Sequence, residues 1–258
     1  MHLTLVRNAT LILNYAGKRL LVDPFFAPQH ALPSFAGVSQ NPTVDLPMPI
    51  EEITAGTDAV FVTHTHGDHF GPVAQDKLDK LLPLFCQPVN ADAIREAGFT
   101  AVTPVDDETE WEGITITRTG GHHGRGGVTE IMGPVSGFVL RAKNEPTLYI
   151  VGDSVLVDEV RESIRTHNPD IIVTNSGGAM WDDPDNPGER TYILMDATET
   201  IKIARFAPGA SIVAVHMEAL DHCTVTRAEL RAAADAAGVP PHRIIIPAEG
   251  EFVAFQRG

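Results

Sequence analysis

The sequence predicts an α/β protein in which short strands and helices interleave, and we expect residues 1–258 to form a single domain. Of the 258 residues, 43% are hydrophobic and 21% are charged. This composition is typical of a globular chain of a length that buries a large core. Apolar, β-rich runs alternate with amphipathic helical segments through the second half of the chain. No low-complexity segment interrupts this pattern to suggest a linker.

The first part of the chain predicts a small antiparallel sheet followed by a long loop. Three β-rich runs at 3–7, 10–14 and 18–24 are short and closely spaced, which is typical of a meander. Residues 24–49 include six prolines and show no periodicity. Loops of this length in compact domains are often functional. The residues leave two interpretations open, a lid or rim over a site and a surface excursion with no chemical role.

The remaining elements alternate between the two types. Residues 59–63 form a continuous apolar strand that ends in a polar cluster, and Pro72 is expected at the first turn of a helix that extends to about Leu82. The spacings Asp196–Glu199 and Thr226–Glu229 are those of capping boxes at helix starts. We further expect strands at 84–86, 114–118, 136–141, 148–151, 171–174 and 212–215, helices at 91–97, 155–166, 197–206 and 227–237, and terminal strands.

The charge balance and the N-terminus limit the partners that the sequence favours. There are 19 Lys and Arg against 34 Asp and Glu, a formal net charge of -15. This balance disfavours binding to nucleic acid or to an anionic membrane. The N-terminus lacks the pattern of a signal peptide, and no run reaches the ~18 apolar residues of a membrane span. We therefore expect a cytoplasmic protein that acts on a small molecule, while the oligomeric state is not predicted.

The two cysteines and the histidines point to different chemistries. Cys86 and Cys223 lack the close spacing of a zinc knot, so buried free thiols are expected. In contrast, the segment His64-Thr65-His66-Gly67-Asp68-His69 places three of the chain's 11 histidines and a carboxylate in six residues. Alternate residues of an extended segment share a side, and Gly67 permits a turn. One short loop could therefore approach two metal ions.

Further metal-ligand candidates follow other strands. His122 and His123, Asp153, and His216 each lie just beyond an apolar run, and such strand ends can gather at one edge of a sheet. These additional candidates disfavour the alternative of a solvated, histidine-rich loop. Imidazole and carboxylate ligands suit Zn²⁺, with Mn²⁺ or Fe²⁺ as alternatives. Successive side chains project oppositely from an extended backbone, so His122 and His123 cannot both face one metal.

The HxHxDH loop, followed in order by His, Asp and His at strand ends, resembles the metallo-β-lactamase superfamily over nearly the whole chain. The segments 21–25 and 133–138 look like the compact bacterial hydrolases related to ascorbate-6-phosphate lactonase. The resemblance implies a four-layered αββα sandwich of two mixed sheets. It also implies two divalent ions. Of the two adjacent histidines, we expect His123 to be the metal ligand, because it precedes a glycine, as the ligand does in related bacterial sequences. Its ligand set is His64, His66 and His123 for one ion, Asp68, His69 and His216 for the other, and Asp153 as the bridge.

The resemblance further implies a hydrolase that uses a metal-bridging hydroxide, with Asp68 as the catalytic residue that positions it. We expect a small-molecule ester, lactone or phosphoester as substrate. Two alternatives are a phosphodiesterase or nuclease-type metallo-hydrolase and a non-catalytic metal- and ligand-binding scaffold. The acidic balance disfavours the first, and the complete ligand set disfavours the second. The sequence shows neither a GxSxG elbow nor a cysteine with a convincing base nearby.

Several polar residues near the predicted strand ends have two interpretations. Asp23 can be a turn carboxylate, or it can orient a ligand imidazole. The segment 175–178 can contact substrate or form a plain turn. His222 lies beyond the strand end, where a structural or substrate-contact role is expected. The isolated histidines are expected to have no catalytic role: His2, His30, His167 and His242.

Overall fold

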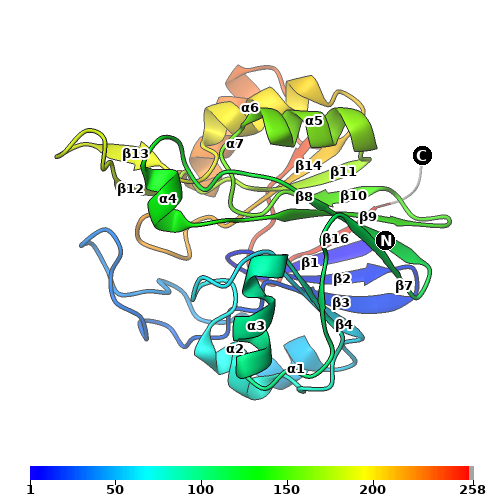
Figure 1. Ribbon diagram of the computed structural model, residues 1–258. Coiled ribbons are helices and arrows are strands. Elements are labelled where there is room, and N and C mark those ends of the chain that lie inside the picture. Colours follow the sequence, from blue (N-terminus) through cyan, green and yellow to red (C-terminus); the bar gives the residue numbers. More distant parts are fainter. Residues whose placement is uncertain (256–258) are drawn as a thin grey trace.

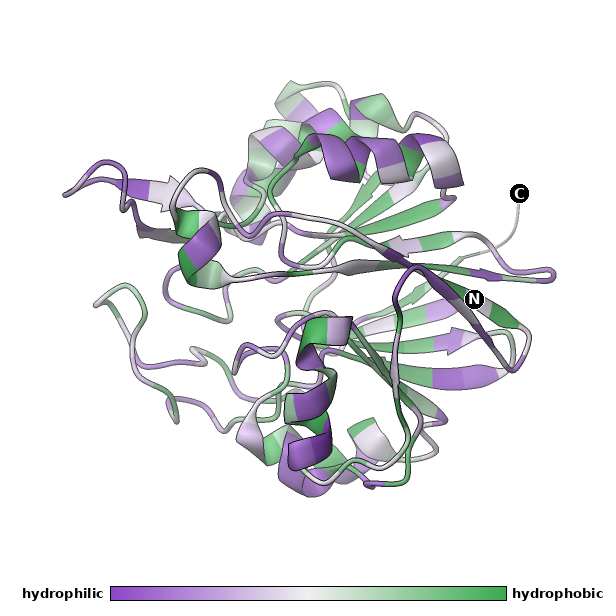
Figure 2. Cartoon of the chain, in the orientation of Figure 1, coloured by the Kyte–Doolittle hydropathy of each residue, from purple (hydrophilic) through white to green (hydrophobic). Residues whose placement is uncertain are grey.

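The computed structural model describes residues 1–255 and shows two facing β-sheets with helices on both outer faces (Figure 1). This is the four-layered αββα sandwich that was expected, and the fold class is confirmed. The apolar layer between the sheets includes Leu5, Phe61, Phe138 and Val213. In Figure 2 the strands carry long hydrophobic stretches with some hydrophilic ends, and the helices carry mixed colours, as expected for elements with one face in water. Within residues 1–255, no helix is long and apolar enough to cross a membrane.

The first sheet contains the N-terminal meander and a parallel extension. Its first three strands in sequence pair antiparallel, as predicted, and the strands that follow add on parallel to the third. The C-terminal strand returns to pair with the first one. In spatial order the strands are β16 (Phe252–Ala254), β1 (His2–Arg7), β2 (Thr10–Tyr15), β3 (Lys18–Val22), β4 (Ala59–Val62), β5 (Leu84–Cys86) and β6 (Val102–Pro104).

The second sheet has parallel strands on one side and antiparallel strands on the other. In spatial order they are β15 (Ile244–Ile245), β14 (Ser211–Val215), β11 (Ile171–Asn175), β10 (Leu148–Ile150), β9 (Gly137–Ala142), β8 (Ile114–Thr119) and β7 (Glu108–Trp111). Strands β8, β10 and β14 run in the same direction, so their carboxyl ends share one edge. A separate hairpin pairs β12 (Met180–Asp182) with β13 (Arg190–Tyr192).

Helices cover the outer faces of both sheets (Figure 1). The first sheet packs against α1 (Ile50–Thr54), α2 (Pro72–Lys77) and α3 (Ala91–Glu96), with the 3₁₀ turn η1 (Pro88–Asn90) before α3. The second sheet packs against α5 (Asp158–His167), α6 (Ala197–Phe206) and α7 (Arg227–Ala236). The short helix α4 (Val128–Met132) lies beside the β12–β13 hairpin in Figure 1.

The helix starts show which local signals decide the structure. Thr226 and Glu229 form the predicted capping box at α7. At α6, Asp196 accepts a hydrogen bond from the Glu199 N–H, but the Glu199 carboxylate binds Arg125 and the Leu156 N–H instead of closing the box. Val157, the residue before α5, is extended, so the helix predicted over 155–166 begins only at Asp158.

The helix predicted from Pro72 to about Leu82 is shorter than expected and ends at Lys77. Leu78 is extended and buried in the core under the first sheet. Leu82 precedes Pro83, and a residue before proline is restricted to extended conformations. Burial of Leu78 therefore sets the helix end, and Pro83 prevents its continuation.

Candidate metal centre

The loop after β4 forms one side of the centre. It leaves a fully buried apolar strand and turns tightly, because the N–H groups of His69 and Phe70 both donate to the carbonyl of His66. Gly71 closes this turn at the start of α2, where a Cβ would lie 2.4 Å from the carbonyl oxygen of Gly67. Glycine is therefore required at this close approach. The turn brings His64, His66, Asp68 and His69 to one edge of the sandwich.

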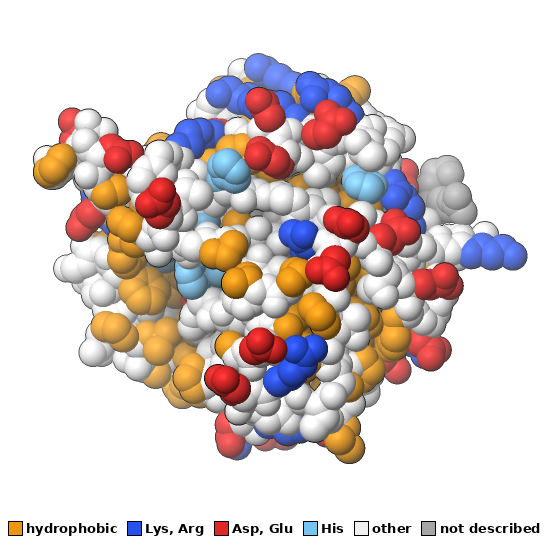
Figure 3. Space-filling model, in the orientation of Figure 1, with side chains coloured by type: hydrophobic (Ala, Val, Ile, Leu, Met, Phe, Trp, Pro, Cys, Tyr) orange, Lys and Arg blue, Asp and Glu red, His pale blue; other side chains and the backbone are white. Residues whose placement is uncertain are grey.

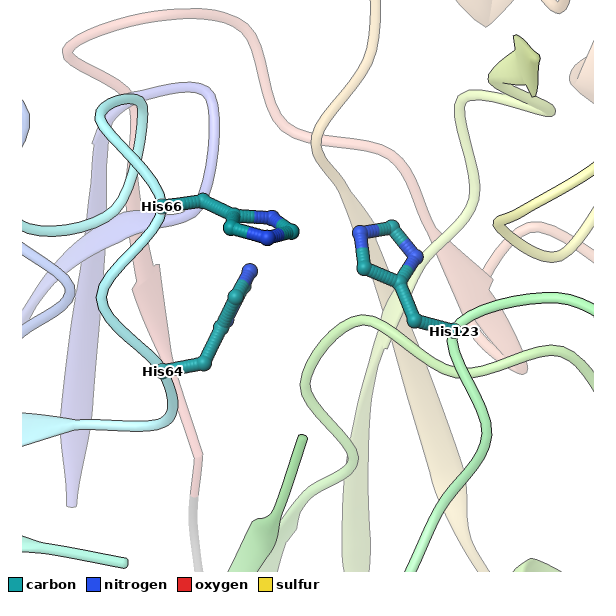
Figure 4. A group of neighbouring side chains, drawn as sticks. All are labelled: His64, His66 and His123. Carbon is teal, nitrogen blue, oxygen red and sulfur yellow. The ribbon is translucent and has the colours of Figure 1, made fainter. Parts of the chain in front are cut away.

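The other side comes from strand ends of the second sheet. His123 follows β8, Asp153 follows β10 and His216 follows β14. In Figure 4, the rings of His64 and His66 lie close together, and the ring of His123 faces them from the opposite side. The strand directions thus bring together residues that are up to 152 positions apart in the sequence, from His64 to His216.

Asp153 lies at the middle of this cluster. Its Oδ2 atom is 3.2 Å from His69 Nε2 and 3.4 Å from His123 Nε2. The same oxygen is 3.8 Å from His64 Nε2 and 3.7 Å from His216 Nε2. A single carboxylate oxygen therefore faces imidazoles from both predicted ligand sets, which is the arrangement a bridging ligand needs.

Asp68 lies on the side of the cluster formed by His69 and His216. Its Oδ2 atom is 3.2 Å from His216 Nε2 and 3.5 Å from His69 Nε2. Asn8 donates to the same oxygen at 3.2 Å and so fixes the carboxylate. Three groups have ligand atoms within 4.8 Å of one another: His64, His66 and His123; His64, His69 and Asp153; and Asp68, His69 and His216.

The hydrogen bonds of the imidazoles fit a metal centre. Asp23 Oδ2 lies 2.9 Å from His69 Nδ1, and the carbonyl of Ile193 lies 2.9 Å from His123 Nδ1. With Nδ1 occupied, the Nε2 atom is presented to the middle of the cluster, as in metal sites whose ligands are oriented by outer partners. The Nε2 atoms of His64 and His69 are buried and have no hydrogen-bond partner among residues 1–255. Buried nitrogens without partners are costly unless something binds them, and divalent metals supply that partner.

Comparison with known proteins agrees with this geometry. The profile of the Beta-lactamase superfamily domain matches residues 18–217. The chain belongs to the metallo-β-lactamase superfamily. It is 36% identical over 261 aligned residues to the UPF0173 protein YddR of Bacillus subtilis, which covers 99% of this chain and 100% of that protein.

Two solved structures are similar to this superfamily member over its whole length. An isothiocyanate hydrolase from Delia radicum gut bacteria has 39% identity and a TM-score of 0.91, with 100% of both chains covered. A possible metal-dependent hydrolase from Veillonella parvula has 31% identity and a TM-score of 0.92, with 99% of both chains covered. The protein is therefore a metal-dependent hydrolase of the metallo-β-lactamase superfamily.

The neighbouring histidines 122 and 123 have different environments. His123 is 3% exposed and belongs to the cluster. His122 faces solvent, with its Nε2 atom 3.2 Å from the Glu159 carboxylate. This placement agrees with the choice of His123 made from the sequence, and its ligand role stays a prediction.

The structure also shows where Asp23, Asn175 and the two cysteines lie. Asp23 orients His69, and it accepts hydrogen bonds from the N–H and hydroxyl of Thr63 as well. Asn175 donates to Asp153 Oδ1 and holds that carboxylate. Cys86 is buried as expected, and burial raises the pKa of its thiol to about 12. The prediction of burial is wrong for Cys223, which is half-buried, with Sγ 3.7 Å from His216 Nδ1.

Without metal, burial and neighbouring charges shift the pKa values of the cluster histidines in different directions. Burial lowers the pKa of His64 well below its ordinary value, and the charge of His69 lowers it further. Burial disfavours a charged His216 too, but Asp153 and Asp68 outweigh it and raise the pKa of His216 to about 10. The same balance, with Asp153, Asp68 and Asp23 against burial, raises the pKa of His69 well above its ordinary value. In the metal-free protein His69 and His216 thus hold protons at neutral pH.

These protons predict the pH dependence of metal binding. Ligation requires neutral imidazoles, so metal must displace the protons of His69 and His216, and affinity should rise with pH by up to about two log units per pH unit between pH 6 and 8. Competition with a chromophoric chelator at pH 6, 7 and 8 measures the slope. Calorimetry in buffers of different ionisation enthalpy counts the protons. An affinity that is flat over this range would contradict the protonated state of the metal-free site.

A pocket of about 320 Å³ opens beside the cluster. Its polar lining comes from the cluster and from His222, while its apolar lining comes from separate elements. Phe35 belongs to the loop 24–49, Trp181 to β12, and Ile193 follows β13. The lining residues are Phe35, His66, Gly67, Asp68, His123, Ile131, Met132, Asp153, Trp181, Ile193 and His222. Figure 3 shows hydrophobic side chains gathered on the left of this face, below the β12–β13 hairpin.

The loop 24–49 therefore forms part of the pocket rim, one of the two interpretations left open by its sequence. The Asp221 carboxylate holds the part of the loop that carries Phe35. Asp221 accepts hydrogen bonds from the N–H groups of Phe35 at 2.9 Å and of Ala36, Val38 and Ser39 at 3.2 Å. The Ser34 hydroxyl and the Asn41 amide donate to it as well. We call this set of contacts the loop anchor.

Proposed function

We propose that this protein hydrolyses small, uncharged electrophiles that carry an apolar substituent. Isothiocyanates are the first candidate class, and esters and lactones are the second. The observation that carries the proposal is the pocket, which joins the histidine and aspartate cluster directly to the side chains of Phe35, Ile131 and Trp181. An apolar wall beside a few convergent polar groups is typical of a small-molecule site.

The chain's own residues supply the frame for this chemistry. We infer that His64, His66 and His123 hold one divalent ion and that Asp68, His69 and His216 hold the second, with Asp153 between them. Zn²⁺ is our first choice, with Mn²⁺ or Fe²⁺ as alternatives. When bound, such ions activate a water molecule as nucleophile and polarise the group under attack. Asp68, held by Asn8, orients the nucleophile, and Asp23 and Asn175 keep the ligands in place.

The pocket lining disfavours anionic substrates. Among the described residues that line it there is no lysine or arginine. Phosphate groups are commonly bound by such cations, and contacts to a nucleic-acid backbone depend on them. Phosphoesters therefore rank below esters and lactones, and a nuclease activity ranks lower still.

The similar isothiocyanate hydrolase supports the first candidate class. An isothiocyanate has an electron-poor carbon between nitrogen and sulfur, no net charge, and a substituent that is often apolar. Adding one water to it yields a primary amine and carbonyl sulfide, so no further reactant is needed. The apolar wall would hold the substituent, and the cluster would face the carbon.

A substrate panel tests the proposed function. The zinc-loaded protein would be assayed with benzyl isothiocyanate, phenyl acetate, a δ-lactone and bis(p-nitrophenyl) phosphate. We expect kcat/KM for the isothiocyanate to exceed that for the phosphodiester by at least about 100-fold, equivalent to about 2.7 kcal/mol of transition-state binding. Fastest turnover of the phosphodiester, or none of the uncharged substrates, would contradict the proposal.

The number of bound ions is a separate prediction. Seven candidate ligands exceed the four positions of a tetrahedral site, so we expect about two divalent ions per chain. Elemental analysis after saturation with zinc or manganese and removal of excess ion gives the stoichiometry. A value of one or less would contradict the dinuclear centre while leaving a mononuclear hydrolase possible.

Replacing Asp221 by Ala should impair substrate binding more than chemistry. Loss of the loop anchor would free Phe35 from the pocket wall, so KM for benzyl isothiocyanate should rise about tenfold, a loss of about 1.4 kcal/mol. The metal content should stay unchanged, because Asp221 lies outside the ligand groups. Steady-state kinetics checks this, with Asp235→Ala on the exposed face of α7 as control. A fall in kcat at constant KM would argue against a binding role.

A further inference from the structure

His222 is a buried polar residue of the pocket wall that the metal centre does not use. It lies beyond β14 and is 6% exposed. Its ring stands nearly perpendicular to Phe35 and Trp181, with centroid distances of 5.2 and 6.5 Å. It is absent from the three groups that could hold a metal within residues 1–255. The two aromatic side chains hold the ring in the pocket wall, beside the place where substrate would lie.

The imidazole of His222 has a ring nitrogen without a hydrogen-bond partner within residues 1–255 of the protein. Among the described residues, the buried Nδ1 atom of His222 has no hydrogen-bond partner. The cluster histidines His69 and His123 differ, because each has Nδ1 bound to a protein oxygen. A buried polar group without a partner costs stability, and each instance in a native protein calls for a reason. A ligand that supplies the missing partner is such a reason, and the ring lines the pocket where a ligand would enter.

The ring is neutral at physiological pH. Burial lowers the pKa of His222 to about 4, and the nearby carboxylate of Asp68 offsets this only in part. A neutral imidazole carries one N–H donor and one acceptor nitrogen. It can therefore donate a hydrogen bond without adding a positive charge of its own beside the metal ions.

We propose that His222 is a catalytic residue that donates a hydrogen bond to the substrate atom that gains negative charge. This inference rests on the proposed function. In an isothiocyanate, attack of the water oxygen on the central carbon forms a C–O bond and moves one C=N electron pair onto nitrogen. The proton lost by water ends on that nitrogen, and the N–H of His222 stabilises the charge in between. In an ester, attack first moves the C=O electron pair onto the carbonyl oxygen, and the atom that His222 serves is the alkoxy oxygen, which takes the C–O electron pair and a proton as it leaves.

Two variants separate this role from packing. His222→Phe keeps an aromatic ring against Phe35 and Trp181 but removes the donor, and His222→Gln keeps an N–H donor. We expect His222→Phe to lower kcat by about 100-fold, the loss typical of removing one such donor, and His222→Gln to recover part of it. Across aryl esters of graded leaving-group acidity, the loss should grow as the leaving group becomes poorer. The exposed His242→Phe serves as control and should leave kcat unchanged.

Two further measurements keep this test distinct from that of the proposed function. Metal content should equal that of the parent in both variants, and a loss of metal in His222→Phe would show a ligand role instead. Calorimetry with N-benzylthiourea, which keeps the N–C–S skeleton and resists hydrolysis, should show about tenfold weaker binding to His222→Phe, a loss of about 1.4 kcal/mol. Equal binding together with equal kcat would overturn the inference. If the parent protein hydrolyses nothing in the panel, the proposed function fails, and binding of the thiourea still decides the role of His222.

Discussion

Replacing Asp68 by Asn is expected to slow hydrolysis by at least about 10–100-fold while the fold stays largely intact. The substitution keeps the shape and one acceptor oxygen but removes the negative charge that faces His69 and His216. Affinity for the second ion should fall as well. The neighbouring Asn8 adds to the effect, because its amide donates to Asp68 Oδ2 and would meet a second amide if the side chain placed its nitrogen there.

Rates measured with excess zinc separate lost occupancy from lost chemistry in this variant. Elemental analysis reports how many ions are bound, and thermal unfolding reports whether the fold survives. Asp76→Asn, an exposed substitution in α2, is the matched control and should behave as the parent protein does. Parent-like turnover by a fully loaded Asp68→Asn protein would show that Asp68 has no catalytic role.

Replacing His123 by Ala should weaken metal binding at least as strongly, by about 10–100-fold or more. His123 is buried, its Nδ1 is bound to the carbonyl of Ile193, and its Nε2 is 3.4 Å from the central oxygen of Asp153. Its removal would leave His64 and His66 without the third nitrogen of their group. Chelator competition measures the affinity, and hydrolysis at saturating zinc measures the remaining rate.

The adjacent His122→Ala substitution provides the comparison. His122 is only partly buried, lies outside the metal-ligand groups and pairs with Glu159 at the start of α5, so its loss should affect metal binding little. Surface pairs of this kind contribute about 0–1 kcal/mol to stability, and thermal unfolding should change accordingly little. If His122→Ala were the more damaging change, the ligand would be His122 and the geometry of the loop after β8 would differ from that described.

Much of the fold can be predicted because its strong elements carry local signals. The buried strands β4, β11 and β14 each contain a continuous apolar run, and α7 begins at a complete capping box. Weak elements lack such signals. Strands β6, β12 and β13 are three residues long, and α1 and α4 are five residues long, too short to show a period. Strand β6 forms by pairing with β5, and β12 and β13 form by pairing with each other.

The candidate site, too, contains residues that the sequence could predict and residues that it could not. The metal-ligand candidates could be proposed because four lie in one motif and the others end strong strands. The apolar wall of the pocket could not, because Phe35, Ile131 and Trp181 come from a long loop, a short helix and an isolated hairpin. The role of Asp23 was open between two interpretations, since only the tertiary structure places its carboxylate beside His69.

The loop anchor has a consequence for how such a pocket can change over evolution. Asp221 holds the rim mainly through main-chain N–H groups, which every residue except proline possesses. Side chains along 35–39 can therefore be exchanged while the path of the chain is retained, except at Gly37, whose φ of 77° favours glycine. Phe35, which lines the pocket, can change size or polarity without disturbing the candidate metal ligands at the strand ends. Relatives could thus diverge in what they accept while retaining one way of cleaving it.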